Sequence, residues 1–177
     1  WLAKKRADAV VLSALDSIAW TFNVRGKDVE RTPVGLAYAL VNRDGTADLF
    51  VQPEKIGEDV AQHLGNAVRL HDRAEFPKAL ATFKGKRVAV DPERAVAAIF
   101  ERLEKGGAEA LQLRDPAVLA KAIKNGAEIA GHQAAQARDG AAIVRFLHWL
   151  SIEAPKGGLD ELTASDKLES LRRETGL

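Results

Sequence analysis

The chain has 177 residues, 46% of them hydrophobic, which is enough to build a sizeable core without disulfides or structural metals. Lys and Arg number 26 against 25 for Asp and Glu, so a net charge of +1 argues against nucleic acid or an anionic membrane as a partner. Cysteine is absent, which excludes disulfides, thiolate nucleophiles and sulfur-ligated metals and favours the reducing cytoplasm.

The apolar stretches are too short for a membrane span, since Arg145 and His148 interrupt even residues 141–150 and about 20 apolar residues are needed. The first residues do not resemble a signal peptide. The sequence begins at Trp1 and contains no methionine, so we expect a piece of a longer protein. The alternative is that modified methionines are missing from the sequence, in which case neighbours in this numbering need not be bonded.

The first elements indicate an α/β fold. Residues 9–13 (AVVLS) form a continuous apolar run of the kind that is buried on both faces of a sheet. Residues 15–23 then place Ile18, Ala19 and Phe22 at helical spacing. The apolar runs 34–42 and 47–52 are separated by Arg43-Asp44-Gly45-Thr46, and Asp-Gly between two such runs predicts a β-hairpin.

The remaining segments alternate between helix and strand. The patterns predict helices over 53–64, 73–83 and 92–105 and strands over 67–70, 87–90 and 109–113, with glycines where the helices should stop. The fold class is therefore α/β, with a mixed sheet of roughly six strands flanked by helices. After Asp115-Pro116 only helices are predicted: a turn through 124, a long helix over 127–152 and, after a Pro-Gly break, a helix over 163–175 in which Thr163 and Asp166 suggest a capping box.

The familiar catalytic signatures are missing. The chain has no glycine-rich nucleotide fingerprint and no Gly-x-Ser-x-Gly elbow. Its histidines are scattered without the i, i+4 spacing of a helical metal site, so each is interpreted as a packed or surface residue. Asp91-Pro92 follows a strand, where α/β sheets place ligands, but a capping role for Asp91 is favoured.

The loop from Val24 to Asp28 is the one candidate binding element. A guanidinium, a glycine and a carboxylate after a helix would let Arg25 meet an anionic group. The alternative is an internal ion pair that ties down the loop.

Three strings resemble one known family. Residues 15–20 (LDSIAW), 22–29 (FNVRGKDV) and 32–34 (TPV) are similar to the middle domain of three-domain Xaa-Pro aminopeptidases. Residues 120–125 (AKAIKN), with Glu128 and Ile129, resemble the entry into the catalytic domain of that family. Residues 138–140 (RDG), 146–150 (FLHWL) and 155–158 (PKGG) resemble the first helices of that domain.

The resemblance implies a creatinase N-terminal-like middle domain over 1–118. Residues 119–177 would be the first helices of a pita-bread catalytic domain, which binds two divalent metal ions, usually manganese, and removes the residue before a proline. All metal ligands of that family lie downstream, so the resemblance assigns no metal or catalytic residue here and predicts an inactive chain. Arg25 and Asp28 become candidates for facing the substrate cleft, and homodimers are common in the family. The alternatives are a catalytically inactive pita-bread relative that binds proteins and a prolidase-like or creatinase-like hydrolase.

Overall fold

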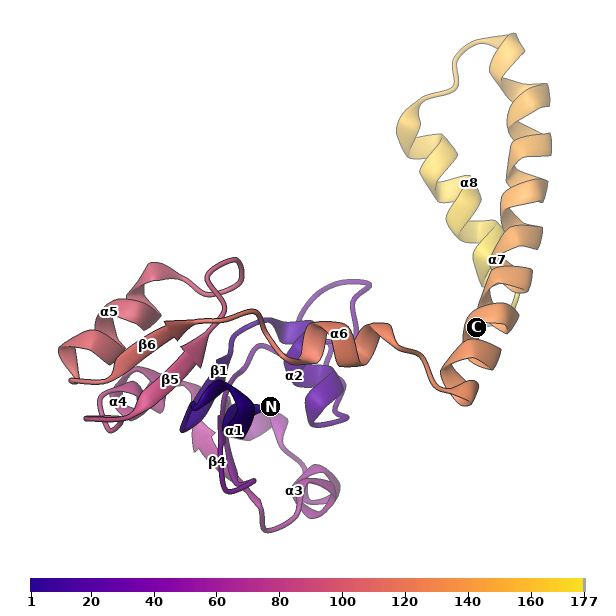
Figure 1. Ribbon diagram of the computed structural model, residues 1–177. Helices are drawn as coiled ribbons and strands as arrows, with labels where there is room; N and C mark the ends of the chain where they lie inside the picture. Colours follow the sequence, from indigo (N-terminus) through magenta and orange to yellow (C-terminus); the bar gives the residue numbers. More distant parts are fainter. Residues whose placement is uncertain (177) are drawn as a thin grey trace. The chain divides into compact units, whose positions relative to one another are not determined.

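The protein is described by a computed structural model that covers residues 1–176 (Figure 1). Its centre is a six-stranded sheet with the order β4-β3-β2-β1-β5-β6. The strands are β1 (Ala9–Leu12), β2 (Tyr38–Asn42), β3 (Ala47–Val51), β4 (Val68–Asp72), β5 (Arg87–Val90) and β6 (Glu109–Gln112). Only β2 runs antiparallel to its neighbours, so the carboxyl ends of the other five strands meet at one edge. This confirms the predicted mixed sheet.

Helices connect these strands and complete the chain. They are α1 (Leu2–Lys5), α2 (Leu15–Thr21), α3 (Glu58–Leu64), α4 (Phe76–Leu80), α5 (Ala97–Lys105), α6 (Ala117–Ala122), α7 (Gly126–Glu153) and α8 (Glu161–Arg173), with short 3-10 turns at η1 (Pro53–Lys55), η2 (Arg73–Glu75) and η3 (Ala154–Lys156). No helix in the described part of the chain is long and apolar enough to cross a membrane.

The sheet is buried on both faces, as the apolar run of β1 predicts. Val10 and Leu12 join a cluster with residues of α2, while Val11 joins a second cluster with Phe76 of α4 and Leu103 of α5. Because successive side chains of a strand point to opposite faces, one strand supplies both cores. The predicted hairpin is also present, with Gly45 at a φ of 91° in the turn between β2 and β3.

Several predicted helices are shorter than expected. The helix predicted over 53–64 is divided at Gly57, and the one predicted over 73–83 ends at Leu80. The helix predicted from Pro92 begins only at Ala97, because Pro92 lies in a tight turn where the amides of Arg94 and Ala95 donate to the Asp91 carbonyl at 3.2 and 2.9 Å.

The predicted cap of the last helix is wrong. Asp160, not Thr163, caps α8, and its carboxylate accepts a hydrogen bond from the Thr163 amide at 2.7 Å. The long helix α7 begins with a capping box that was not predicted: Asn125 accepts from the Glu128 amide, and Glu128 accepts from the Asn125 amide.

The described chain divides into two compact units, residues 1–123 and residues 124 onward. The second unit is a hairpin of α7 and α8. Arg172 pairs with Asp139 at 2.7 Å, Arg145 pairs with Glu174 at 2.6 Å, and the Lys167 ammonium lies 5.9 Å from the ring centre of Trp149.

Candidate binding pocket at the carboxyl edge of the sheet

The loop over residues 22–37 joins α2 to β2 and lies at the carboxyl edge of the sheet, where α/β folds usually place ligands. Its two limbs touch through glycines, since a Cβ added to Gly26 would lie 2.6 Å from the Gly35 Cα. The Asp28 amide donates to the Val34 carbonyl at 3.3 Å. The loop is therefore a folded element held by its own backbone.

Arg25 anchors this loop to the end of α2. Its Nη1 donates to the carbonyls of Ala19 and Val24, both at 2.9 Å. Carbonyls near a helix C-terminus lack helical partners and carry partial negative charge, so a guanidinium is well placed there. Arg25 does not pair with Asp28, and the rest of its side chain is exposed.

Asp28 pairs with Lys55, which comes from the 3-10 turn after β3. The Lys55 ammonium lies 2.8 Å from both carboxylate oxygens, and the Leu36 amide donates to one of them at 2.7 Å. The hydrogen bond from Lys55, with that from the Leu36 amide, holds the pKa of Asp28 below its ordinary value. The carboxylate thus stays charged and joins the loop to η1, the 3-10 turn after β3.

The sequence-predicted residues Arg25 and Asp28 line one pocket of about 300 Å³. Apolar side chains from α2 and β3 form most of its wall, including Ile18, Leu49 and Val51. Among the described residues that line it there is no serine, histidine or cysteine. Whether Arg25 and Asp28 face a substrate stays a prediction.

The favoured helix-capping role of Asp91 is wrong, because α5 begins at Ala97 with Val96 as its N-cap and Asp91 holds the turn before it. Asp91 is 4% exposed, and its two oxygens accept hydrogen bonds from the amides of Glu93 at 2.9 Å and Asp115 at 2.8 Å. Asp115 in turn accepts from the Ala117 amide at 2.8 Å, at the start of α6. The two buried aspartates therefore connect β5 to the segment that leaves β6.

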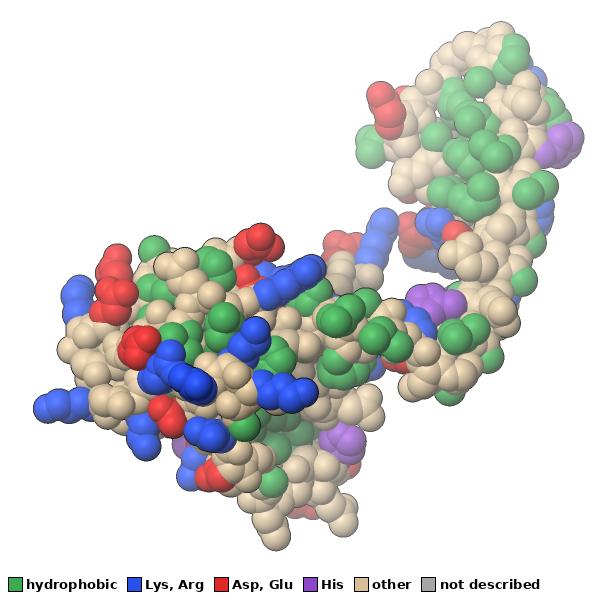
Figure 2. Space-filling view, in the orientation of Figure 1, with side chains coloured by type: hydrophobic (Ala, Val, Ile, Leu, Met, Phe, Trp, Pro, Cys, Tyr) green, Lys and Arg blue, Asp and Glu red, His purple; other side chains and the backbone are tan. Residues whose placement is uncertain are grey.

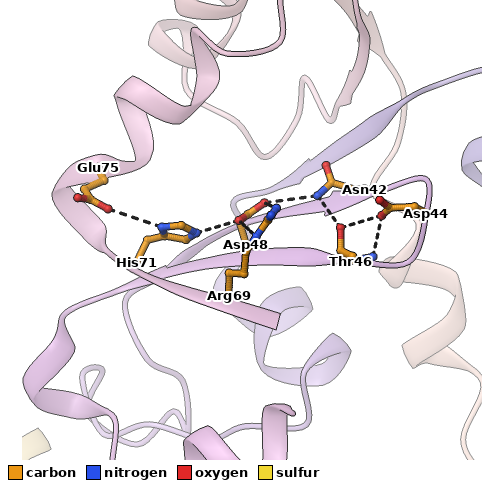
Figure 3. A network of polar contacts seen from close by, with 7 residues as sticks. All are labelled: Asn42, Asp44, Thr46, Asp48, Arg69, His71 and Glu75. Atoms are coloured by element: carbon orange, nitrogen blue, oxygen red, sulfur yellow. Dashed lines mark hydrogen bonds and ion pairs between the residues drawn. The ribbon is translucent and has the colours of Figure 1, made fainter. Parts of the chain in front are cut away.

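A second polar cluster, which the sequence did not predict, lies on β3 and the edge strand β4 (Figure 3). Asp48 of β3 accepts hydrogen bonds from Arg69 at 2.8 and 2.9 Å and contacts His71 Nε2 at 2.8 Å. Glu75 lies 3.6 Å from the other ring nitrogen of His71, whose ring stacks on Phe50. The cluster lines a pocket of about 720 Å³.

Burial acts to raise the pKa of Asp48, but the hydrogen bonds from Arg69 and His71 outweigh it and hold that pKa below its ordinary value. The sequence signal for this cluster was weak. Arg69 and His71 lie two residues apart on an edge strand, a spacing that is typical of a solvated face. Their shared partner Asp48 is 21 and 23 positions away in the sequence.

The other histidines are also packed or on the surface. The ring of His63 lies 3.1 Å from the Phe22 carbonyl, and His132 and His148 are exposed on α7. Within residues 1–176, no group of three or more His, Asp or Glu side chains is arranged to hold a metal ion. These residues do not fit a two-metal centre.

The fold and its helical extension define the class of protein. The family model of the creatinase/prolidase N-terminal domain matches residues 1–128, so the chain belongs to that family.

The relatives narrow this class. A probable Xaa-Pro aminopeptidase P from Paracoccidioides brasiliensis (strain Pb03) is 40% identical over 97% of this chain and 30% of its own length. Its counterpart from Aspergillus clavatus is 37% identical over 99% of this chain and 28% of its own length. The chain thus spans about 30% of the length of the curated relatives that it matches.

Solved structures agree with the fold. The X-prolyl aminopeptidase of Caenorhabditis elegans, a cytosolic enzyme with a dinuclear active site, superposes with a TM-score of 0.82 at 28% identity, over 97% of this chain and 29% of that one. The Xaa-Pro dipeptidase of Bacillus anthracis superposes with a TM-score of 0.73 over 98% of this chain and 46% of that one, but at 15% identity it supports the fold alone.

Proposed function

We propose that this chain is the non-catalytic middle domain, with the first helices of the catalytic domain, of a metal-dependent Xaa-Pro aminopeptidase. The parent protein would remove an N-terminal residue that precedes proline. One observation carries the proposal: sequence identity of 40% to a probable Xaa-Pro aminopeptidase P extends over 97% of the chain.

The metal chemistry belongs to the rest of the parent in this proposal. Two divalent ions, with manganese as our first choice, would activate a water and stabilise the oxyanion at the scissile carbonyl. The described residues offer no group that could hold a metal ion. We therefore expect the 177-residue chain to have no peptidase activity of its own, and we place the parent in the cytoplasm, as for the worm enzyme.

The proposed domain boundary lies near residue 118, with residues 119–177 opening the catalytic domain. The α7–α8 hairpin supports this assignment, because hydrophobic side chains remain on its surface (Figure 2). Val144 is 67% exposed and Leu162 is 77% exposed, whereas only Ala142 and Leu171 of the described hairpin are buried hydrophobics. Apolar helix faces of this kind are normally covered by further elements of the same domain.

We assign the pocket loop to the wall of the substrate cleft. Arg25, Lys27 and Lys55 line the pocket with Asp28, so cations outnumber carboxylates there. In this role the loop would limit access to the cleft and contact the peptide, while taking no part in bond cleavage. We also propose that the parent forms a homodimer.

Two other functions use the same fold. The parent would be a protein-binding module if its downstream domain had lost the metal ligands, or a prolidase-like or creatinase-like hydrolase. The absence of serine, cysteine and histidine among the described residues of the pocket is compatible with the binding module. Similarity to probable Xaa-Pro aminopeptidases P extends over almost the whole chain and favours the first proposal.

The test is a peptidase assay on the full-length parent and on the 177-residue chain, with and without added manganese. We expect the parent to release the first residue of an Xaa-Pro peptide. A chelator should abolish this activity, and added manganese should restore it. The matched control is the same peptide with alanine in second position. An inactive metal-loaded parent would contradict the enzyme proposal, and activity in the short chain would contradict its non-catalytic role.

A further inference from the structure

A third pocket lies between α4 and α5, on the other face of the sheet from the Arg25 loop, and has a volume of about 390 Å³. Its walls are mainly apolar and come from Phe76, Leu80 and Ile99. A volume in this range and an apolar lining with a few polar groups are typical of sites for small organic ligands.

The polar groups of this pocket are cationic or donate hydrogen bonds. Arg73 follows β4 at the carboxyl edge, and Arg102 projects from α5. The only carboxylate in the lining, Asp72, already accepts a hydrogen bond from the Ala74 amide at 2.8 Å. The pocket therefore has two guanidinium groups and one carboxylate, one oxygen of which accepts a backbone hydrogen bond.

Arg73 is held in place but incompletely satisfied. Its guanidinium lies 5.4 Å from the ring centre of Tyr38, and that ring stacks on Phe76 with centroids 4.2 Å apart. The Arg73 Nε is buried and has no hydrogen-bond partner among residues 1–176. An N–H group that is buried without a partner destabilises the protein, so such groups usually meet a ligand or water.

Three other polar groups of the lining are also available to a ligand, and of these Arg102 is exposed to solvent. Within the described chain, no hydrogen bond or ion pair involves the Arg102 side chain, the Tyr38 hydroxyl or the Gln52 amide group. Val96, at the mouth of the pocket, is 62% exposed. Two guanidinium groups beside a mainly apolar wall favour an anionic group attached to an apolar body.

We propose that this pocket binds an apolar carboxylic acid, with the carboxylate paired to Arg73 and Arg102 and the apolar part against Phe76, Leu80 and Ile99. A planar guanidinium matches a carboxylate in two parallel hydrogen bonds, which makes it more selective than an ammonium for this group. The site is independent of the aminopeptidase proposal, because it lies outside the Arg25 pocket and needs no metal.

Two sources can supply this chemistry: the carboxyl terminus of a peptide that ends in an apolar residue, and a free aryl or alkyl acid. The test uses the 177-residue chain labelled with ¹⁵N and titrated with N-acetyl-L-phenylalanine, followed by amide chemical shifts. We expect saturable shifts at Val96, Ile99 and Arg102 with a Kd in the millimolar range or tighter. Titration with 4-phenylbutyrate distinguishes the two sources. If it binds as tightly as N-acetyl-L-phenylalanine or more tightly, the ligand is a simple acid, and if it binds more weakly, the ligand is a peptide terminus.

The matched ligand control is N-acetyl-L-phenylalanine amide, which has the same apolar body without the charge. It should bind at least about tenfold more weakly, because it loses charge-assisted hydrogen bonds. Equal binding of acid and amide would overturn the proposal, as would shifts that map away from α4 and α5 or no saturable shifts.

The matched protein variants are Arg102→Gln and Lys105→Gln. Both remove one positive charge from an exposed position of α5, but Lys105 does not line the pocket. We expect the first to weaken binding about tenfold and the second to leave it unchanged. Val96→Glu, at an exposed site that tolerates substitution, should abolish binding by repelling the carboxylate. Binding that survives both Arg102→Gln and Val96→Glu would refute the assignment.

Discussion

Gly26 and Gly35 are in direct backbone contact within the loop that carries Arg25. A Cβ at Gly26 would lie 2.6 Å from both the Cα and the amide nitrogen of Gly35, which are backbone atoms that cannot turn aside. We expect Gly26→Ala to destabilise the protein by about 1–3 kcal/mol, as overpacking does. Urea unfolding followed by fluorescence measures this.

The control is the same substitution at Gly131, in the middle of α7, where an added Cβ meets nothing within 4 Å. Gly131→Ala should stabilise α7 by about 0.5–1 kcal/mol, because alanine loses less conformational entropy in a helix. Equal effects of the two substitutions would show that the contact between the loop limbs is unimportant.

Asp48 contacts the polar side chains of Asn42, Arg69 and His71. Its side chain is 13% exposed and pairs with both Arg69 and His71. Asp48→Asn removes the charge and leaves these donors poorly matched, so we expect a loss of about 2 kcal/mol in the free energy of unfolding. Glu104→Gln is the control, since Glu104 is exposed on α5 and should give a change near zero.

The same residue predicts a pH dependence. Because the folded state lowers the pKa of Asp48, its contribution is complete above the ordinary carboxyl pKa near 4 and is lost as the pH falls below it. The native protein should therefore lose stability between about pH 4 and 2, and the Asp48→Asn variant should lose less over that range. Parallel acid curves for the two proteins would contradict this origin.

Single side chains show where inference from sequence ends. Arg25 and Asp28 were selected because they share a loop, and both line one pocket. Their partners were not predictable: Lys55 is 27 residues from Asp28, and only the packing of η1 beside the loop joins them. The Asp48 cluster was missed for the same reason, since contacts across a sheet depend on strand order and register.

At the scale of elements, the Asn125 side chain is one half of the capping box that begins α7. Asn125 accepts from the Glu128 amide at 2.9 Å, which satisfies one of the first amides of a 28-residue helix. Asn125→Ala should cost about 1 kcal/mol at this end, so hydrogen exchange of the Glu128 amide should become about fivefold faster. Gln133→Ala, within the same helix, is the control and should leave that rate unchanged.

Element boundaries were the least predictable part of the fold. Strand β5 and the hairpin follow from local pattern, since a continuous apolar run and Asp44-Gly45 act over a few residues. Helix starts depend on which side chain reaches a free amide. Asp160 reaches the Thr163 amide and so begins α8 before the predicted Thr163, whereas Asp91 holds a turn and delays α5.

At the scale of the whole molecule, the sequence predicted the mixed sheet and the change to helices. Continuous apolar runs indicate strands that are buried on two faces, and helical spacing of apolar residues indicates helices. The pockets were not predictable, because each lies between elements that are distant in sequence. The α4–α5 pocket, for example, joins Tyr38 to Arg102. Sequence similarity identifies the family, whereas only the folded structure shows that the polar residues of this pocket lie close together.

The two compact units should differ in stability when separated. The sheet and its flanking helices hold both hydrophobic clusters, whereas the described α7–α8 hairpin buries only Ala142 and Leu171 as hydrophobic residues. Residues 1–123 should therefore unfold cooperatively on their own, with a thermal midpoint within a few degrees of the main transition of the 177-residue chain. Residues 124–177 should melt gradually, because surface ion pairs such as Arg172–Asp139 add little. Circular dichroism of the two fragments measures both, and a cooperative melt of the isolated hairpin would contradict its assignment as an incomplete part of a larger domain.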